Sequence, residues 1–271
     1  MERLNGSGRS AAQSQSAASQ TSSSESDPEK SYLPGQAKSL SGIAIRAFSL
    51  GLAQAIGTIS TLAILLLTSS PLWRLPFLLS TLSIFHFLEF WTQARYNTRE
   101  AGTMHFLLSA NGVAYTGAHA ASALECLFAN TILPSFSLRR MSAAGPSLSI
   151  VLTLVGVAVV VLGQTVRSVA MMQAGKSFNH HVQETKKASH VLVTTGLYGS
   201  LRHPSYFGFY WWVLGIQLVM GNTLCFLVYV LVLYRYYSHR IPYEESFLVK
   251  FFGNEYVDYR KKVGTKIPFV P

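Results

Sequence analysis

Charged residues are scarce in this sequence. They make up 13% of its 271 residues, about half the share found in ordinary globular proteins. Hydrophobic residues make up 49%, and they gather in long blocks instead of the alternating or one-faced patterns of water-soluble strands and helices. The composition therefore argues against a water-exposed globule and predicts an all-α polytopic membrane protein.

Cysteine is also rare. Cys126 and Cys225 both lie in apolar stretches and are too few for a disulfide framework, so we expect packed free thiols.

Residues 1–31 have no apolar segment behind a basic start, so we expect no cleavable secretory signal and insertion through the first internal apolar block. The terminal Pro-Phe-Val-Pro is not a CaaX prenylation motif, so we expect no lipid attached at that end.

A basic stripe interleaved with stacking aromatic residues is missing too. The net charge is +10, but much of the positive charge lies beside apolar blocks. We therefore expect no nucleic acid partner, and instead expect lipid headgroups and anionic small molecules.

Large apolar residues are almost absent from residues 1–36, which are rich in Ser, Gln, Ala and Gly. Such a composition cannot bury enough surface to offset the entropy lost on ordering, so it predicts a disordered head. We divide the chain into this head at 1–40, four membrane-spanning helices at 41–166, and a more polar region at 167–271.

Six apolar blocks are candidate membrane-spanning helices. They are Ile43–Leu67, Leu72–Trp91, Met104–Phe128, Ser147–Val166, Tyr206–Met220 and Thr223–Tyr237. His86 and Glu89 stand near the end of the second block, where we expect them at the membrane interface. The last two blocks are separated only by Gly221-Asn222, which requires an antiparallel hairpin. From Arg240 to Pro271, aromatic residues at three- and four-residue intervals predict an amphipathic helix at the membrane surface or capping the bundle.

Basic residues predict the orientation. Twelve Lys and Arg residues follow position 166, and nearly all of them lie in the loop from Arg167 to Arg202 and in the tail. Placing both on the cytosolic side puts the N-terminus and the C-terminus in the cytosol if the spans number six. Arg139 and Arg140 then fall on the opposite side, which conflicts mildly with the rule.

Polar residues suited to chemistry concentrate in the last hundred positions. Gly175-Lys176-Ser177 imitates the end of a phosphate loop, but Ala170 stands where that loop needs glycine and no strand precedes it. The histidines form no compact ligand set, so we expect no metal site. They are His180, His181, His190 and His203.

Three segments remain as candidates. His190–Val193 reads as a short extended run before the Gly196 turn, whose backbone groups can bind an adenine edge; a plain juxtamembrane loop fits equally well. Pro204 suits a helix start, where unpaired N–H groups can bind an anion, although an ordinary membrane-entry motif has the same features.

The third segment contains Arg240, Glu244 and Glu245. Two adjacent carboxylates near bilayer depth are costly unless a cation or hydrogen-bond donors face them, although acids also favour a solvated first turn of a helix. Arg240, four residues before Glu244, can bind a carboxylate through two parallel N–H groups of its guanidinium.

These segments together closely resemble the isoprenylcysteine carboxyl methyltransferases, polytopic enzymes of the endoplasmic reticulum membrane. The similarity runs in order through Ala-Gly-x-x-Phe-Asn-His, His-x-Leu-Val-Thr-x-Gly-x-Tyr, Arg-His-Pro-Ser-Tyr-x-Gly, Arg-x-x-x-Glu-Glu-x-x-Leu and Phe-Phe-Gly-x-Glu-Tyr-x-x-Tyr, from about Arg167 to Pro268. The resemblance implies a catalytic region at 167–271 with a cytosol-facing cofactor pocket. It also implies methyl transfer from S-adenosylmethionine to the α-carboxylate of a C-terminal prenylated cysteine in CaaX-processed proteins, such as small GTPases or lipidated pheromones.

The resemblance also implies roles for individual residues. Arg240 would bind the substrate carboxylate, with Glu244 and Glu245 as further catalytic residues. The cofactor pocket would comprise Gln183, His190, Val191, Leu192, Val193, Tyr198, His203, Pro204, Ser205, Tyr206 and Glu244. Where the family often has a longer acidic run, this chain has Ile241-Pro242-Tyr243, so the division of roles between the two glutamates stays open.

This chemistry needs no general base, because a carboxylate with a pKa near 3.5 is already ionised at pH 7. The alternatives are a membrane phospholipid N-methyltransferase, for which Arg240 has no anion to orient, and an NADPH-dependent sterol reductase, whose sequences resemble only an Arg-His-x-x-Tyr-x-Gly segment. A non-catalytic membrane scaffold would need neither Arg240 nor the glutamate pair.

Overall fold

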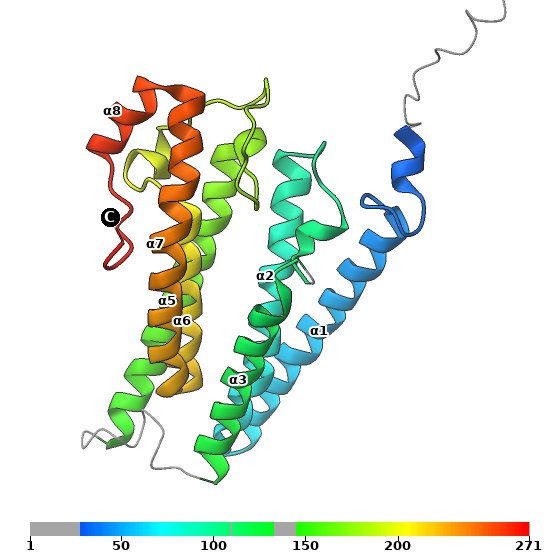
Figure 1. The fold of residues 1–271 in the computed structure, drawn as a ribbon. Coiled ribbons are helices and arrows are strands. Elements are labelled where there is room, and N and C mark those ends of the chain that lie inside the picture. Colours follow the sequence, from blue (N-terminus) through cyan, green and yellow to red (C-terminus); the bar gives the residue numbers. More distant parts are fainter. Residues whose placement is uncertain (1–27, 109, 133–144, 271) are drawn as a thin grey trace, which may run out of the picture.

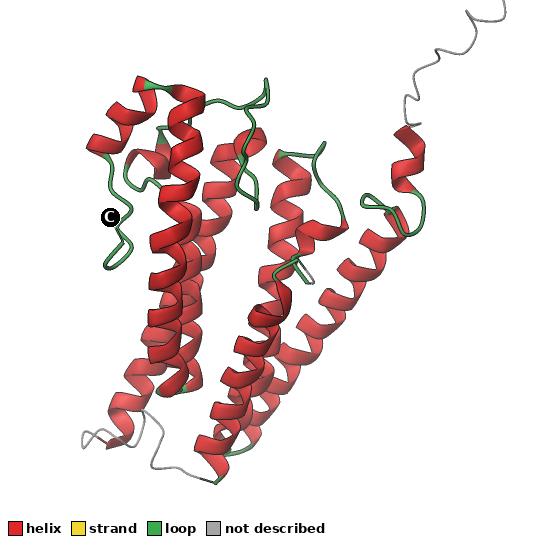
Figure 2. Cartoon of the chain, in the orientation of Figure 1, coloured by secondary structure: helices red, strands yellow, loops and turns green. Residues whose placement is uncertain are grey.

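The computed structural model describes residues 28–108, 110–132 and 145–270, and these contain helices and loops but no strand (Figures 1 and 2). Short 3₁₀ helices are labelled η. The elements in order are η1 Pro28–Tyr32, α1 Leu40–Leu67, η2 Pro71–Trp73, α2 Arg74–Tyr96, η3 Thr103–Phe106, α3 Gly112–Thr131, α5 Gly145–Ala174, η5 Gly175–Ser177, η6 Gly196–Gly199, α6 Pro204–Met220, α7 Leu224–Phe252 and α8 Asn254–Lys262. The all-α expectation is thus confirmed for the described part of the chain.

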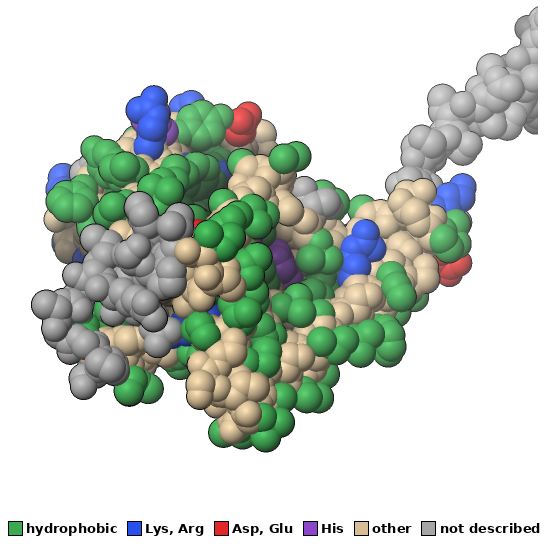
Figure 3. Space-filling view, turned by 90° about the horizontal axis from the view of Figure 1, so that it is seen from below, with side chains coloured by type: hydrophobic (Ala, Val, Ile, Leu, Met, Phe, Trp, Pro, Cys, Tyr) green, Lys and Arg blue, Asp and Glu red, His purple; other side chains and the backbone are tan. Residues whose placement is uncertain are grey.

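Three of the described helical segments are long and apolar enough to cross a membrane by length and composition: Leu40–Leu67, Pro71–Tyr96 and Leu148–Ser177. Many apolar side chains on α1 face outward, with Leu67 82% exposed. Seen from the end opposite α8, hydrophobic side chains cover much of the surface (Figure 3). An apolar exterior of this kind suits a lipid surrounding, and the chain is embedded in the membrane.

Helix α3, which corresponds to the third expected span, differs from its expected boundary. The helix begins at Gly112, not Met104, because the chain first forms η3 and then turns through left-handed backbone at Leu107 and Gly112. The basic pair at 139–140 and most of the Ser-rich head lie outside the described residues.

Helices α5 and α6 form the most closely packed pair. A Cβ atom added to Gly163 would lie 2.5 Å from the backbone nitrogen of Trp212, and one added to Gly208 would lie 2.6 Å from the carbonyl oxygen of Gly163. Glycine at both positions lets the two backbones approach, as small residues do in membrane bundles. This contact brings the end of α5 against the start of α6.

The expected hairpin between the last two apolar blocks is present and joins helices α6 and α7. Gly221 ends α6 with a φ of 73°, and Asn222 donates a hydrogen bond to the Ser122 carbonyl at 2.9 Å. Helix α7 then continues through Pro242 to Phe252, so the expected last span and the first part of the expected amphipathic tail form one helix. Pro242 has no backbone N–H and so omits one hydrogen bond of the helix, which nevertheless continues from its apolar half into its polar half.

The two cysteines behave as expected. Cys126 is buried, Cys225 is half-buried, and the two do not form a disulfide with each other.

Candidate active site

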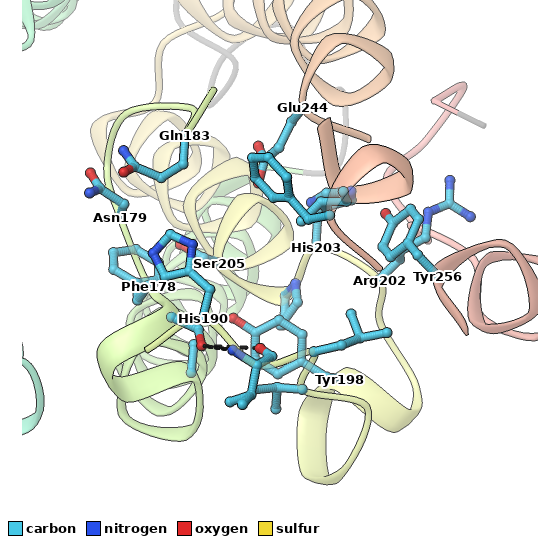
Figure 4. A pocket seen from close by; sticks show the side chains of 18 of the residues that line it. Phe178, Asn179, Gln183, His190, Tyr198, Arg202, His203, Ser205, Glu244 and Tyr256 are labelled. Atoms are coloured by element: carbon cyan, nitrogen blue, oxygen red, sulfur yellow. Dashed lines mark hydrogen bonds between the residues drawn. The ribbon is translucent and has the colours of Figure 1, made fainter. Parts of the chain in front are cut away.

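A cavity opens at the end of the bundle where α7 meets the loops around η6 (Figure 4). The space not filled by atoms is about 1090 Å³, counting its open mouth. All eleven residues expected in the cofactor pocket line it: Gln183, His190, Val191, Leu192, Val193, Tyr198, His203, Pro204, Ser205, Tyr206 and Glu244. The fold therefore gathers four separated sequence segments around one space.

The loop before η6 is held by side chains of the preceding helix. The Ser177 hydroxyl pairs with both backbone groups of Val191, at 3.0 Å each. Within the described residues, the backbone groups of Leu192 and Val193 form no such bond, so they are free to bind an occupant of the cavity. His190–Val193 forms a loop segment, not a strand.

Tyr198 is fixed from two sides. Its hydroxyl donates to the Ala170 carbonyl at 3.3 Å, and its own carbonyl accepts from the Tyr259 hydroxyl at 2.6 Å. Gly196, with a φ of 61°, supplies the left-handed turn that starts η6. Helix α6 follows with Pro204 in its first turn, as the sequence predicts.

Arg240 does not line the cavity itself, but it contacts two residues that do. Its Nε donates to the Tyr206 hydroxyl and its Nη2 donates to the His180 carbonyl, each at 2.7 Å. The Tyr206 hydroxyl in turn donates to Glu244 Oε2 at 2.5 Å. These contacts form a continuous chain from Arg240 to a carboxylate in the cavity wall.

Glu245 does not line the cavity. It is 4% exposed and bonds to Arg202, to His203 Nε2 at 3.0 Å and to Arg260 at 3.5 Å. Burial raises the pKa of this carboxyl, but the His203 hydrogen bond and the charges of His203 and Arg202 outweigh burial and hold the pKa below its usual range. Glu245 thus ties α7 to the start of α6 and to α8.

Sequence reasoning missed several residues at the site. Arg167, Phe178, Asn179, His180 and His181 also line the cavity. A signal for most of them existed, because the Phe-Asn-His motif lies close to Gln183. Arg167 stands at the polar end of an uncharged helix, where a functional cation was a reasonable expectation.

Three comparisons place the chain among known proteins. Residues 154–250 match the model of the isoprenylcysteine carboxyl methyltransferase (ICMT) family. A protein-S-isoprenylcysteine O-methyltransferase of Saccharomyces cerevisiae is 43% identical over 189 residues, covering 70% of this chain and 77% of that protein. The Homo sapiens protein of the same name is 36% identical, covering 84% of this chain and 75% of its own length. A solved structure of the eukaryotic intramembrane Ras methyltransferase ICMT matches with a TM-score of 0.74 at 36% identity, covering 84% of this chain and 77% of that one.

Proposed function

This chain belongs to the isoprenylcysteine carboxyl methyltransferase family, and we propose from that premise that its cavity holds S-adenosylmethionine as the methyl donor. The chain is an enzyme that transfers a methyl group to the carboxyl group of a prenylated cysteine, forming a methyl ester. One observation carries the proposal for the site: Arg240 donates hydrogen bonds to Tyr206 and His180, and both of these residues line the cavity that the eleven expected pocket residues share.

The polar groups that line the cavity fit S-adenosylmethionine. Free backbone groups at Leu192 and Val193 suit the edge of an adenine ring, and Glu244 with Gln183 suits polar and cationic parts of the molecule. The backbone N–H of Ser205, which follows Pro204, has no acceptor among the described residues and suits its carboxylate. When bound, S-adenosylmethionine supplies an electrophilic methyl group on a cationic sulfur.

Arg240 has donors left for a substrate carboxylate. Nε and Nη2 are bonded to Tyr206 and His180, but Nη1 has no bonded acceptor among the described residues. A guanidinium keeps its charge and can orient one carboxylate oxygen toward the cavity. No general base is needed, because the carboxylate is already ionised near neutral pH.

Glu244 weakens the electrostatic attraction between Arg240 and the substrate carboxylate. The Tyr206 hydroxyl accepts from Arg240 and donates to Glu244, so the negative charge of Glu244 offsets the guanidinium through one intermediary. A less dominant cation leaves the bound carboxylate more nucleophilic. Glu245, which faces Arg202 and His203, holds the wall of the site and thereby supports catalysis.

The physiological substrates we propose are prenylated C-terminal cysteines of CaaX proteins, including small GTPases and lipidated pheromones. A prenyl chain gains about 0.8 kcal/mol for each buried CH₂, so a membrane-embedded enzyme can accept it without extracting it into water. We place the enzyme in the endoplasmic reticulum membrane with six spans, and with both termini and the cavity facing the cytosol.

The division into a head at 1–40, four spans at 41–166 and a catalytic region at 167–271 belongs to the same proposal. It is supported by the cavity, whose lining begins at Arg167 and lies wholly in the third part. The phospholipid N-methyltransferase, sterol reductase and scaffold alternatives are disfavoured by the relatives found.

A direct assay tests the function. Membranes containing the chain receive labelled S-adenosylmethionine and N-acetyl-farnesylcysteine, and base-labile methyl esters are counted. Wild-type membranes should form the ester, whereas Arg240→Ala should not, with equal membrane insertion of both proteins. Full activity of Arg240→Ala would remove the proposed anchor, and no ester with wild type would overturn the function.

A further inference from the structure

Glu89 is the most deeply buried acidic residue described in the chain. It lies on α2, outside the residues 154–250 that match the family model, and is only 1% exposed. The sequence predicts it near the membrane interface, and the structure shows that it is enclosed by the bundle. His86, one turn earlier, is buried as well, at 6% exposure. The tilt and packing of α2 decide this, and local hydropathy does not report them.

The carboxylate of Glu89 joins two walls of the cavity. Both of its oxygens accept from Arg167, with Nη2 to Oε2 at 2.8 Å, and Oε2 also accepts from His180 Nε2 at 2.7 Å. Arg167 lies on α5, and His180 lies in the loop beyond η5. A buried carboxylate is tolerated when cations and donors surround it in this way.

Arg167 and His180, the two partners of Glu89, each form a further hydrogen bond with a residue of the site. Arg167 Nη1 donates to the Ser205 hydroxyl at 3.1 Å, and so reaches the first turn of α6. The His180 carbonyl accepts from Arg240 Nη2 at 2.7 Å. Glu89 is therefore one residue away from Ser205 in the donor pocket and one residue away from Arg240.

We propose that Glu89 is a positioning residue for the methyl transfer: it holds His180 so that Arg240 keeps its place, and it neutralises Arg167 so that the substrate carboxylate binds Arg240 alone. This role rests on the proposed function of the site. Arg167 lines the cavity, so without Glu89 its unpaired guanidinium becomes a competing and misplaced site for the carboxylate.

The chain offers a matched control. Glu125 on α3 is a second acidic residue within the helical bundle, and it accepts hydrogen bonds from the backbone nitrogens of Thr223, Leu224 and Cys225 at 2.7–2.8 Å. It caps the start of α7 at the hairpin end and does not line the cavity. Glu125→Gln therefore reports loss of a structural carboxylate without a change at the site.

The experiment compares the purified full chain with Glu89→Gln, Glu89→Asp and Glu125→Gln. Three quantities are measured: kcat and KM for N-acetyl-farnesylcysteine, the Kd of this substrate without methyl donor, and the Kd of S-adenosylhomocysteine. Misplacement of a reacting group by about 1 Å can lower rates about 100-fold. We expect a loss of that order in kcat/KM for Glu89→Gln, with weakened substrate binding.

The Kd of S-adenosylhomocysteine should change less than about threefold in Glu89→Gln, because the walls of its pocket are not held by Glu89. Ser177 holds the segment 190–193, and Ala170 and Tyr259 hold Tyr198. Glu89→Asp keeps the charge on a shorter side chain, so it should recover part of the lost activity while its KM stays above that of wild type. Glu125→Gln should lower thermal stability and leave both constants as in wild type.

Each contrary outcome has a distinct meaning. Wild-type kinetics in Glu89→Gln, or equal losses of substrate and donor affinity, overturn the positioning role while the function stands. If Glu89→Gln does not fold, Glu89→Asp decides: raised KM with intact donor binding supports the role, and unchanged KM overturns it. A wild-type chain that forms no ester overturns the function and this role with it.

Discussion

Glu244 and Glu245 are neighbours in sequence, yet their carboxylates bond to different parts of the molecule. Glu244 accepts from the Tyr206 hydroxyl at 2.5 Å in the cavity wall, whereas Glu245 accepts from His203 Nε2 at 3.0 Å and from Arg202. Successive residues on a helix point about 100° apart, so one helix turn can serve both the cavity and the packing behind it.

The two glutamates should therefore fail in different ways. Glu244→Gln is expected to lower kcat/KM while the thermal unfolding midpoint stays near wild type. Glu245→Gln leaves the half-buried Arg202 without its carboxylate and should destabilise the protein by about 3 kcal/mol, as broken buried pairs do. Methylation kinetics and thermal unfolding of both purified variants check this, and a reversal of the two patterns would contradict it.

Acid should weaken the same contact. The pKa of Glu245 is below its usual range in the folded protein, so the ionised carboxylate contributes stability that is fully present above the unfolded pKa of about 4.3. That contribution is lost as the pH falls through the lower, folded pKa. When the pH is lowered below about 4, the thermal unfolding midpoint of wild type should fall by more than that of Glu245→Gln. Parallel pH curves for the two proteins would show that Glu245 does not titrate as described.

Tyr206→Phe removes the hydroxyl that joins Arg240 to Glu244 and keeps the ring. Loss of a hydrogen bond to a charged group is worth about 1.5–3 kcal/mol, which corresponds to a loss of about 10- to 100-fold in kcat/KM. Steady-state kinetics with N-acetyl-farnesylcysteine measure it. Tyr210→Phe, on the same helix and outside the cavity lining, is the control and should react as wild type.

The approach of α5 to α6 should not tolerate a larger residue. Gly163→Ala places a Cβ 2.5 Å from the backbone nitrogen of Trp212, and backbone cannot move aside as a side chain does. Overpacking of this kind costs about 1–3 kcal/mol, so the unfolding midpoint should fall. In Gly51→Ala, on α1, the new Cβ has no neighbour within 4 Å, and this variant should be neutral or slightly more stable. Equal midpoints for the two variants would contradict the packing.

Much of the site was predictable because its residues occur in short motifs with fixed spacing. Gln183, His190, Tyr198, His203 and Glu244 all line the cavity, as the resemblance implies. Backbone features such as the Gly196 turn and the start of α6 at Pro204 follow from the conformational limits of single residues. The start of α3 and the unbroken length of α7 did not follow, because hydropathy locates apolar residues but not the turns that end helices.

The sequence by itself determined the all-helical membrane architecture, the family and the segments that form the cavity, since composition, hydrophobic blocks and local motifs are properties of the chain alone. Only the tertiary structure decided that Glu89 is buried beneath Arg167 and His180, and that Glu244 and Glu245 face different partners. Such pairings join residues far apart in the chain. They depend on how helices tilt and pack against one another, and no local pattern records that.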